Sequence, residues 1–289
     1  MLAGNFFLPA QNVLRGKADP ERHVLFDNGS SSYCIVVDPE APASEQYAAA
    51  ELRDWLGQVS GAELPICGLD GGEPGKRLVV GYNSLVSELV PDSRPQASSD
   101  DSFTWCSKGG DILFWGGSER GTLYSVYDFL EDALGCRWYT PEVSVAPRKD
   151  SWSFMELHQQ ESPGFLVRDN CTLAARTDLV FSARLRNNIN PLPGKKPGES
   201  LKGTAEGYWG VHAMAGYITA AEYFEEHPEY FGVKDGERFA RGGEYQLCLS
   251  NPDVLRICID KLRKVMREHP DYMVYSMEQL DNENPCQCE

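Results

Sequence analysis

The residues best suited to chemistry stand near the end of the chain, directly after a short and mostly apolar run at positions 272–277. Glu278, Gln279, Asp281 and Asn282 follow that run. Two carboxylates three residues apart on a loop could act on a bound substrate, one as acid and the other as base. They could equally cap the loop or face solvent. Polar residues directly after a strand are typical of the catalytic rim of an α/β barrel.

Three further side chains could bind a polar ligand near such a rim. His212 follows a long polar loop, with Trp209 beside it, and an imidazole can hydrogen-bond a hydroxyl or a carboxylate. An ordinary, partly buried histidine is the alternative interpretation. Arg168 could hold a carboxylate through two parallel hydrogen bonds. A structural salt bridge, with Asp169 for example, would explain this arginine equally well.

The two thiols near the C-terminus raise the question of a metal. Cys286 and Cys288 form a Cys-x-Cys pair, whereas structural zinc normally has four ligands, with thiols spaced Cys-x2–4-Cys. We therefore expect no metal and no cofactor within these residues, although a ligand set completed after residue 289 stays open. Four other cysteines, in apolar surroundings, are predicted to be reduced core thiols: Cys34, Cys106, Cys248 and Cys258.

The charge of the chain argues against nucleic acid and anionic membranes as partners. Its 43 acidic and 27 basic side chains give a formal net charge of −16, which repels phosphate groups. No apolar run approaches the roughly 20 residues of a membrane helix, and residues 1–15 lack the layout of a signal peptide. We therefore expect a cytoplasmic location by default. The oligomeric state stays open.

Residues 1–160 are predicted to form a small α/β domain with a mixed sheet and two helices on one face. A helix capped by Ser44 should end at Gly61, and a second helix should run from Ser118 to Gly135. The run Gly116-Gly117-Ser118 is interpreted as a tight turn and helix cap, rather than an anion site. Strands are expected at residues 33–37, 64–66, 78–81, 102–107, 111–115 and 137–141, the fourth and fifth as a hairpin.

Residues 161–289 alternate between strand and helix patterns, which indicates the opening of a parallel α/β fold. Strands are expected at 165–169, 246–249 and 272–277, and helices at 174–185, at 219–226 and after Asn251-Pro252. The last helix should bury Leu255, Cys258, Ile259, Leu262 and Met266. A loop at 191–207 is long enough to be functional or mobile. A closed (β/α)8 barrel takes roughly 250 residues, so we expect this half to be the first part of a TIM-like barrel.

Two segments of the first half, residues 48–66 and 116–141, resemble the N-terminal domain of α-glucuronidases. A related domain precedes the barrel of β-hexosaminidases. The second half resembles a family of bacterial proteins, catalogued as a domain of unknown function, that joins such a front domain to a glycoside-hydrolase-like barrel. This second resemblance rests on residues 222–231, 235–238 and 246–252, on Gln279-x-Asp281 and on Cys286-x-Cys288.

The resemblance implies a front domain without catalytic residues and a barrel that acts on carbohydrate, with a glycan that contains a uronate as one candidate substrate. Hydrolysis of an O-glycosyl bond uses a pair of carboxylates. Asp281 matches the family motif and Glu278 stands beside it. In α-glucuronidases the acid and base lie on later strands, so the pair could also lie after residue 289. The alternatives are a carbohydrate-binding or interaction module without turnover, and a self-standing α/β protein with an open sheet.

Overall fold

The computed structural model divides the chain into two units, residues 1–162 and 163–289, and each has a hydrophobic core of its own. The part of the chain that it describes comprises residues 21–93, 101–165, 168–170, 172–188, 208–209, 212–270 and 274–288. The long loop predicted at 191–207 falls outside these residues, so that expectation stays a prediction.

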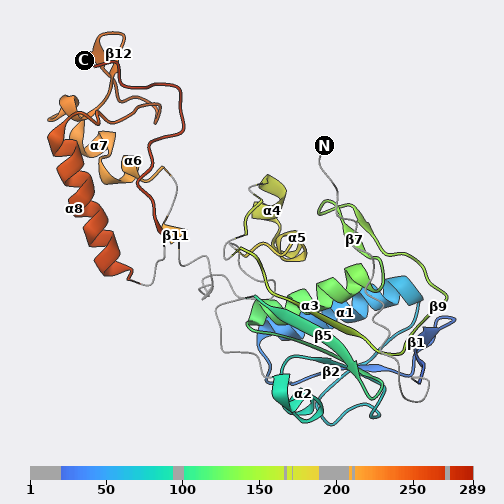
Figure 1. The fold of residues 1–289 in the computed structure, drawn as a ribbon. Helices are drawn as coiled ribbons and strands as arrows, with labels where there is room; N and C mark the ends of the chain where they lie inside the picture. The colour runs from blue at the N-terminus through green and yellow to red at the C-terminus, as the bar shows by residue number, and fades with distance from the viewer. Residues whose placement is uncertain are drawn as a thin grey trace, which may run out of the picture. The chain divides into compact units, whose positions relative to one another are not determined.

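The first unit is built around a six-stranded mixed sheet, as predicted (Figure 1). Four of its strands, β6, β4, β2 and β3, run parallel to one another. The strands β5 and β10 extend the sheet beyond β6 in antiparallel pairing. The spatial order is β10 (His158–Glu161), β5 (Phe103–Lys108), β6 (Asp111–Gly116), β4 (Arg77–Val80), β2 (Cys34–Val37) and β3 (Ile66–Cys67). β5 and β6 form the expected hairpin.

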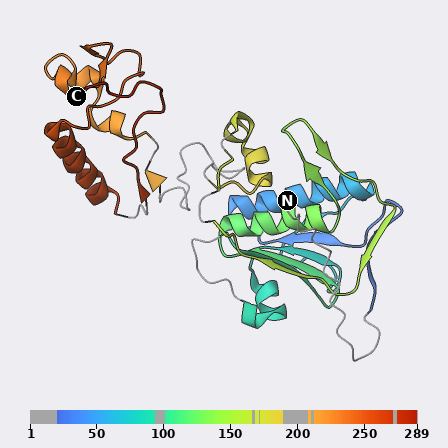
Figure 2. The same ribbon diagram turned by 45° about the horizontal axis from the view of Figure 1, so that its top comes forward.

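Two long helices cover one face of this sheet, which confirms the predicted layering. α1 (Ala43–Ser60) and α3 (Glu119–Asp132) lie side by side there (Figures 1 and 2). A short helix that was not predicted, α2 (Ser84–Leu89), covers the opposite face, where its Val86 packs with Val36 and Val79. No helix among the described residues is long and apolar enough to cross a membrane.

The ends of the two long helices are partly as predicted. Gly61 ends α1 with a left-handed φ of 78°, and Ser118 caps α3 by accepting a hydrogen bond from the Gly121 N–H at 3.3 Å. The prediction of Ser44 as the cap of α1 was wrong, because the helix already begins after Pro42 and Ser44 is buried in its first turn. A proline fixes φ near the helical value and needs no partner for an N–H, so it can start a helix without a side-chain cap.

Three strand predictions in the first unit need correction. The predicted last strand, β7 (Arg137–Trp138), pairs with β8 (Ser144–Val145) in a separate small sheet. The polar stretch at 147–163, for which no strand was predicted, carries β9 (Ser151–Phe154), which pairs with another unpredicted strand, β1 (His23–Asp27). It also carries β10, at one edge of the main sheet. An edge strand needs few apolar residues, so its sequence gives little signal.

Two glycines, Gly116 at the end of β6 and Gly121 in the first turn of α3, let backbones approach closely. A Cβ on Gly116 would lie 2.2 Å from the carbonyl carbon of Gly121, and a Cβ on Gly121 would lie 2.3 Å from the Ser102 oxygen. Neither position has room for a side chain beside fixed backbone. The glycines thus allow the first turn of α3 to pack onto the end of β6. This agrees with the interpretation of residues 116–118 as a tight turn and helix cap.

We expect Gly116→Ala to lower the free energy of unfolding by about 1–3 kcal/mol, because the new methyl group must displace backbone. Urea denaturation of the whole chain measures this effect. Gly216→Ala, in the short helix α6 (Met214–Tyr217), is the matched control, since a Cβ there meets nothing within 4 Å. The control should be neutral or gain up to about 1 kcal/mol. Equal stability of both variants would contradict the close-packing interpretation.

The described residues of the second unit form short helices, two small strand pairs and one long helix. β11 and β14 form a parallel pair, and β12 and β13 form an antiparallel hairpin. The aromatic residues Tyr230 and Phe231 lie in its core, with Tyr223 and Phe224 packed against them. The elements are α4 (Leu173–Thr177), α5 (Leu179–Arg184), β11 (Tyr208–Trp209), α6, α7 (Ala220–Tyr223), β12 (Val233–Lys234), β13 (Glu237–Arg238), α8 (Pro252–Glu268) and β14 (Val274–Tyr275).

Several predictions for the second unit differ from the structure. The helix predicted at 174–185 is two helices, because the Asp178 side chain accepts a hydrogen bond from Phe181 N–H at 2.8 Å and caps a new start. Residues 246–249 form no strand, and only one isolated bridge joins Leu247 to Phe231. Of the strand predicted at 165–169, residues 166–167 are outside the described part, and the others are not in a strand.

Helix α8 begins as predicted, with Asn251 as its cap and Pro252 in its first turn. Its predicted buried face was partly wrong, since Leu255 and Met266 are 60% and 46% exposed. Cys258 is buried, as expected, but it shares the core with Val254, and Ile257, Leu262 and Val265 pack against it. Apolar residues cover more than one face of this helix, so periodicity alone allowed two registers.

Candidate functional site

The candidate residues of the second unit gather after the ends of its two parallel strands. His212 follows β11, and Glu278 and Gln279 follow β14. His212 Nδ1 lies 2.8 Å from the Gln279 carbonyl oxygen, and the His212 N–H donates to Glu278 Oε2 at 3.3 Å. The Met214 N–H donates to the Glu278 carbonyl at 3.2 Å. The loops that follow two adjacent parallel strands are therefore joined.

His212 itself has an uncommon backbone conformation. Its φ is 55°, in the left-handed region that residues other than glycine seldom occupy. Such residues persist only where their surroundings hold them, and they are frequent at binding and catalytic sites. Here the two hydrogen bonds to the 278–279 segment supply that support.

The other predicted site residues are placed differently. Asp281 is exposed on the loop that also carries Glu278 and Gln279. Trp209 lies in β11, but its side chain is outside the described part of the structure. Arg168 donates from Nε to the Arg186 carbonyl at 2.9 Å and from a terminal nitrogen to the Phe165 carbonyl at 3.0 Å. Arg168 thus belongs to a network that closes its own segment of chain.

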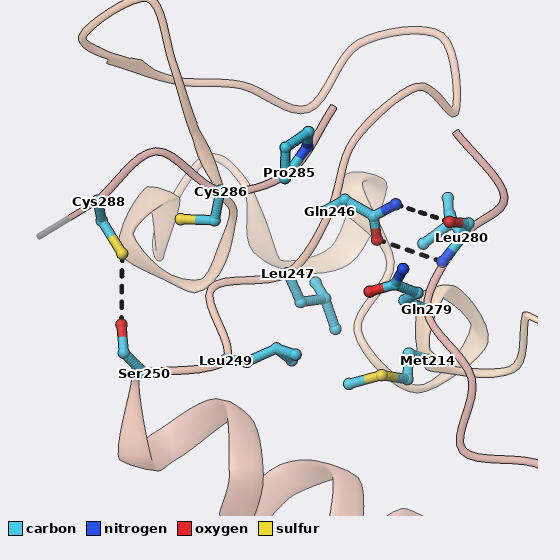
Figure 3. A pocket seen from close by; sticks show the side chains of 10 residues that line it. All are labelled: Met214, Gln246, Leu247, Leu249, Ser250, Gln279, Leu280, Pro285, Cys286 and Cys288. Carbon is cyan, nitrogen blue, oxygen red and sulfur yellow. Dashed lines mark hydrogen bonds between the residues drawn. The ribbon is translucent and has the colours of Figure 1, made fainter. Parts of the chain in front are cut away.

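A cavity of about 320 Å³ lies beside the 279–288 segment (Figure 3). The side chain of Gln246 fixes one wall of the cavity, since its Nε2 donates to the Leu280 carbonyl at 2.6 Å and its Oε1 accepts from the Leu280 N–H at 3.2 Å. The cavity is at the small end of the range for ligand pockets. Its lining residues are Met214, Gln246, Leu247, Leu249, Ser250, Gln279, Leu280, Pro285, Cys286 and Cys288.

Three cysteine sulfurs meet at one end of this cavity. The Sγ atoms of Cys248, Cys286 and Cys288 all lie within 4.8 Å of one another, and Cys248 and Cys288 are 3.7 Å apart. The Ser250 hydroxyl contacts both, 3.3 Å from Cys248 Sγ and 3.4 Å from Cys288 Sγ; Figure 3 shows its contact with Cys288. Cys248 is 3% exposed, whereas the other two are half-buried.

The surroundings of Cys248 favour its thiolate form. Burial raises the pKa of this thiol, but hydrogen bonds from Ser250, Arg238 and the two neighbouring cysteines outweigh burial and lower the pKa to about 7. Ordinary core thiols behave in the opposite way. Burial raises the pKa of Cys106 and of Cys136 to about 11. Cys248 is therefore chemically unlike the other buried cysteines. At its neighbour Cys288 the hydrogen bond with Ser250 lowers the pKa, but hydrogen bonds with Cys286 and Cys248 outweigh it and raise the pKa.

Only Cys286 and Cys288 were considered as metal ligands from the sequence. Cys248 stands 40 positions before Cys288 and was assigned to a core strand. It is buried, as were the other three predicted core thiols. One signal pointed away from a strand. Polar Gln246 and Ser250 stand two positions on either side of it in the sequence, which fits a loop better than a core strand.

Comparison with known proteins now adds the family. Residues 138–289 match the family model described as "Domain of unknown function (DUF4838)", which covers more than half of the chain. The chain belongs to this family. No curated protein matches it.

Two solved structures that this chain resembles are described as a glucuronidase and a hexosaminidase. One is a "novel family GH115 4-O-Methyl-alpha-glucuronidase, BtGH115A, with specificity for decorated arabinogalactans", 14% identical, with a TM-score of 0.51 over 86% of this chain and 41% of that chain. Another is the Streptomyces plicatus N-acetyl-β-hexosaminidase, 15% identical, with a TM-score of 0.39 over 87% of this chain and 55% of that one.

At these identities the likeness to BtGH115A concerns the fold alone. It supports a mixed α/β fold. This chain spans 41% of the length of that glucuronidase. The closed barrel stays a prediction.

Proposed function

We propose that this protein acts on carbohydrate as a glycoside-hydrolase-like enzyme, and that its second unit opens a TIM-like barrel after a non-catalytic front domain. One observation carries the proposal. The loops after β11 and β14 meet through His212, Glu278 and Gln279. Loops at the carboxyl ends of adjacent parallel strands are the place where barrel enzymes bind and transform their substrates.

The proposed roles follow from the chemistry of these side chains. Glu278 and Asp281 are the carboxylates for acid and base or nucleophile, and His212 orients Glu278 through its backbone N–H. Gln279 offers an amide to sugar hydroxyls. The fold likeness to a 4-O-methyl-α-glucuronidase suggests a glycan that carries a uronate as the substrate.

Carbohydrate binding without turnover is the second candidate, and one observation favours it. The residues that line the described cavity include amides, a hydroxyl and thiols, but no carboxylate. Such a surface can hold a sugar through hydrogen bonds without cleaving it.

The experiment uses arabinogalactan decorated with 4-O-methylglucuronate, and the same polysaccharide after its carboxyl groups are reduced. Calorimetric titration measures binding, and a uronic acid assay measures release. We expect His212→Ala and Glu278→Gln to weaken binding at least about tenfold, since hydrogen bonds to charged groups contribute about 1.5–3 kcal/mol. His158→Ala, at an exposed position on β10, is the matched control and should bind as the wild type does.

The outcomes separate the two candidates. Release by the wild type that Asp281→Asn and Glu278→Gln abolish would support hydrolysis. Binding by the wild type that His212→Ala weakens, with no release by any variant, would support the second candidate. If neither polysaccharide binds, or if His212→Ala and His158→Ala bind equally well, the proposed sugar site is wrong.

A further inference from the structure

The three-cysteine cluster has the dimensions of a metal site. In a tetrahedral zinc site with Zn–S bonds of about 2.3 Å, neighbouring sulfurs lie about 3.8 Å apart. Cys248 and Cys288 Sγ are already 3.7 Å apart, and no pair in the cluster exceeds 4.8 Å. Small side-chain rotations would bring all three sulfurs to the required spacing.

The surroundings of the cluster also suit metal-bound thiolates. The Val233 N–H, on the β12–β13 hairpin, donates to Cys286 Sγ at 3.3 Å, and the Ser250 hydroxyl is within reach of the other two sulfurs. The Arg238 guanidinium, on the same hairpin, donates to the Phe231 carbonyl at 2.7 Å and brings a positive charge near Cys248. Ligands held by such outer contacts are typical of metal centres. Three thiolates with a divalent ion carry one net negative charge, which Arg238 would balance.

The backbone is shaped to bring these groups together. The Gln287 N–H donates to the Val233 carbonyl at 2.8 Å, and the Asp235 N–H donates to the Gln287 side chain at 2.8 Å. A Cβ on Gly232 would come within 3.3 Å of Cys286, so a glycine lets the two segments approach. Cys286 and Cys288 are thereby fixed on either side of a residue that is itself tied to the hairpin.

We infer that Cys248, Cys286 and Cys288 form a three-thiolate site that binds one Zn²⁺ ion. Soft thiolate ligands in this geometry select zinc over hard cations such as Mg²⁺ or Ca²⁺. The fourth position is left to an exchangeable ligand such as water, entering from the cavity that Cys286 and Cys288 line. This inference goes beyond the proposed sugar chemistry and does not depend on it.

The test uses the full chain, purified under reducing conditions, with Zn²⁺ or Co²⁺ alone as the probe. We expect one equivalent of zinc per chain by mass spectrometry of metals. Co²⁺ should give a thiolate-to-metal charge-transfer absorption and the intense visible bands of tetrahedral coordination. Each of Cys248→Ser, Cys286→Ser and Cys288→Ser should weaken zinc binding by more than about 100-fold, beyond the 10–100-fold range of outer-shell changes. Ser250→Ala should fall within that range.

Two controls keep the result decisive. Cys67→Ser removes a half-buried thiol of the first unit, beside Cys34, and should leave stoichiometry and cobalt spectrum unchanged. If a ligand variant fails to fold, the wild type still decides, because a chelator should lower its melting temperature in the same reducing buffer. The inference is overturned if the reduced wild type gives no cobalt–thiolate absorption, if Cys248→Ser binds zinc as tightly as the wild type, or if the cluster holds only a Cys248–Cys288 disulfide.

Discussion

Replacement of Arg77 by alanine should destabilise the first unit by about 3–5 kcal/mol, the range for a buried ion pair that loses one partner. Arg77 and Asp111 begin the adjacent parallel strands β4 and β6 and are 9% and 1% exposed. Asp111 Oδ2 accepts from the guanidinium at 2.6 and 3.0 Å, and Oδ1 accepts from the Arg77 N–H at 2.8 Å. Without the guanidinium, a buried carboxylate has lost its countercharge.

Urea denaturation followed by tryptophan fluorescence can measure this loss, because all tryptophans except Trp209 lie in the first unit. Lys76→Ala is the matched control from the neighbouring position. Its partner Glu73 is 2.9 Å away, and both side chains are exposed, so the change should stay below about 1 kcal/mol. If both variants lost the same stability, the ion pair would not be what holds β4 against β6.

A second variant separates lost charge pairing from lost packing. The double variant Arg77→Ala with Asp111→Asn removes the buried charge. The asparagine keeps a side-chain oxygen that can accept from the backbone N–H of residue 77. We expect the double variant to regain part of the stability that Arg77→Ala loses, since the uncompensated carboxylate is the costly element. A double variant that is less stable than Arg77→Ala would point to packing instead.

Phe129→Ala should also cost about 3–5 kcal/mol, because it opens a cavity in a dense aromatic cluster. Phe129 is fully buried on α3, and its ring lies edge-on to those of Trp105, Phe114 and Trp152 at centroid distances of 5.4, 5.2 and 5.6 Å. These contacts join α3 to the strands β5, β6 and β9. The same fluorescence-detected denaturation reports the effect.

Size and exposure provide the controls for this prediction. Phe129→Leu conserves most of the volume and should cost less than about 1.5 kcal/mol. Phe165→Ala removes the same ring at a position that is 78% exposed, and should change stability by no more than about 0.5 kcal/mol. A loss at Phe129 as small as the loss at Phe165 would contradict the role of the aromatic cluster.

The first unit was largely predictable because its signals are local. Continuous apolar runs such as residues 33–37 and 78–81 match strands β2 and β4, and the capping residues Gly61 and Ser118 mark helix ends. Each of these features depends on a few neighbouring residues. The weak points were polar edge strands, such as β10, whose pairing is decided by the rest of the sheet.

The second unit was less predictable because its important contacts join distant parts of the chain. Nothing near His212 in sequence announces its hydrogen bonds to the 278–279 segment, 66 and 67 positions away. The third thiol of the cluster was likewise hidden until folding brought the 246–250 loop against the chain's last residues. Local propensity carries no information about such pairs, since they depend on tertiary packing.

The two hydrogen bonds between the Gln246 side chain and the Leu280 backbone join two parts of the chain that lie 34 residues apart, the 246–250 loop and the 278–288 segment. A glutamine side chain offers one acceptor and one donor in the order of a peptide group, so it recognises a single alignment of the 278–288 segment. A slip by one residue would move Glu278 away from His212 and both terminal thiols away from Cys248. The same contact with Gln246 therefore positions Glu278 at one end of this segment and Cys286 and Cys288 at the other. A displacement of either end would shift the other end as well.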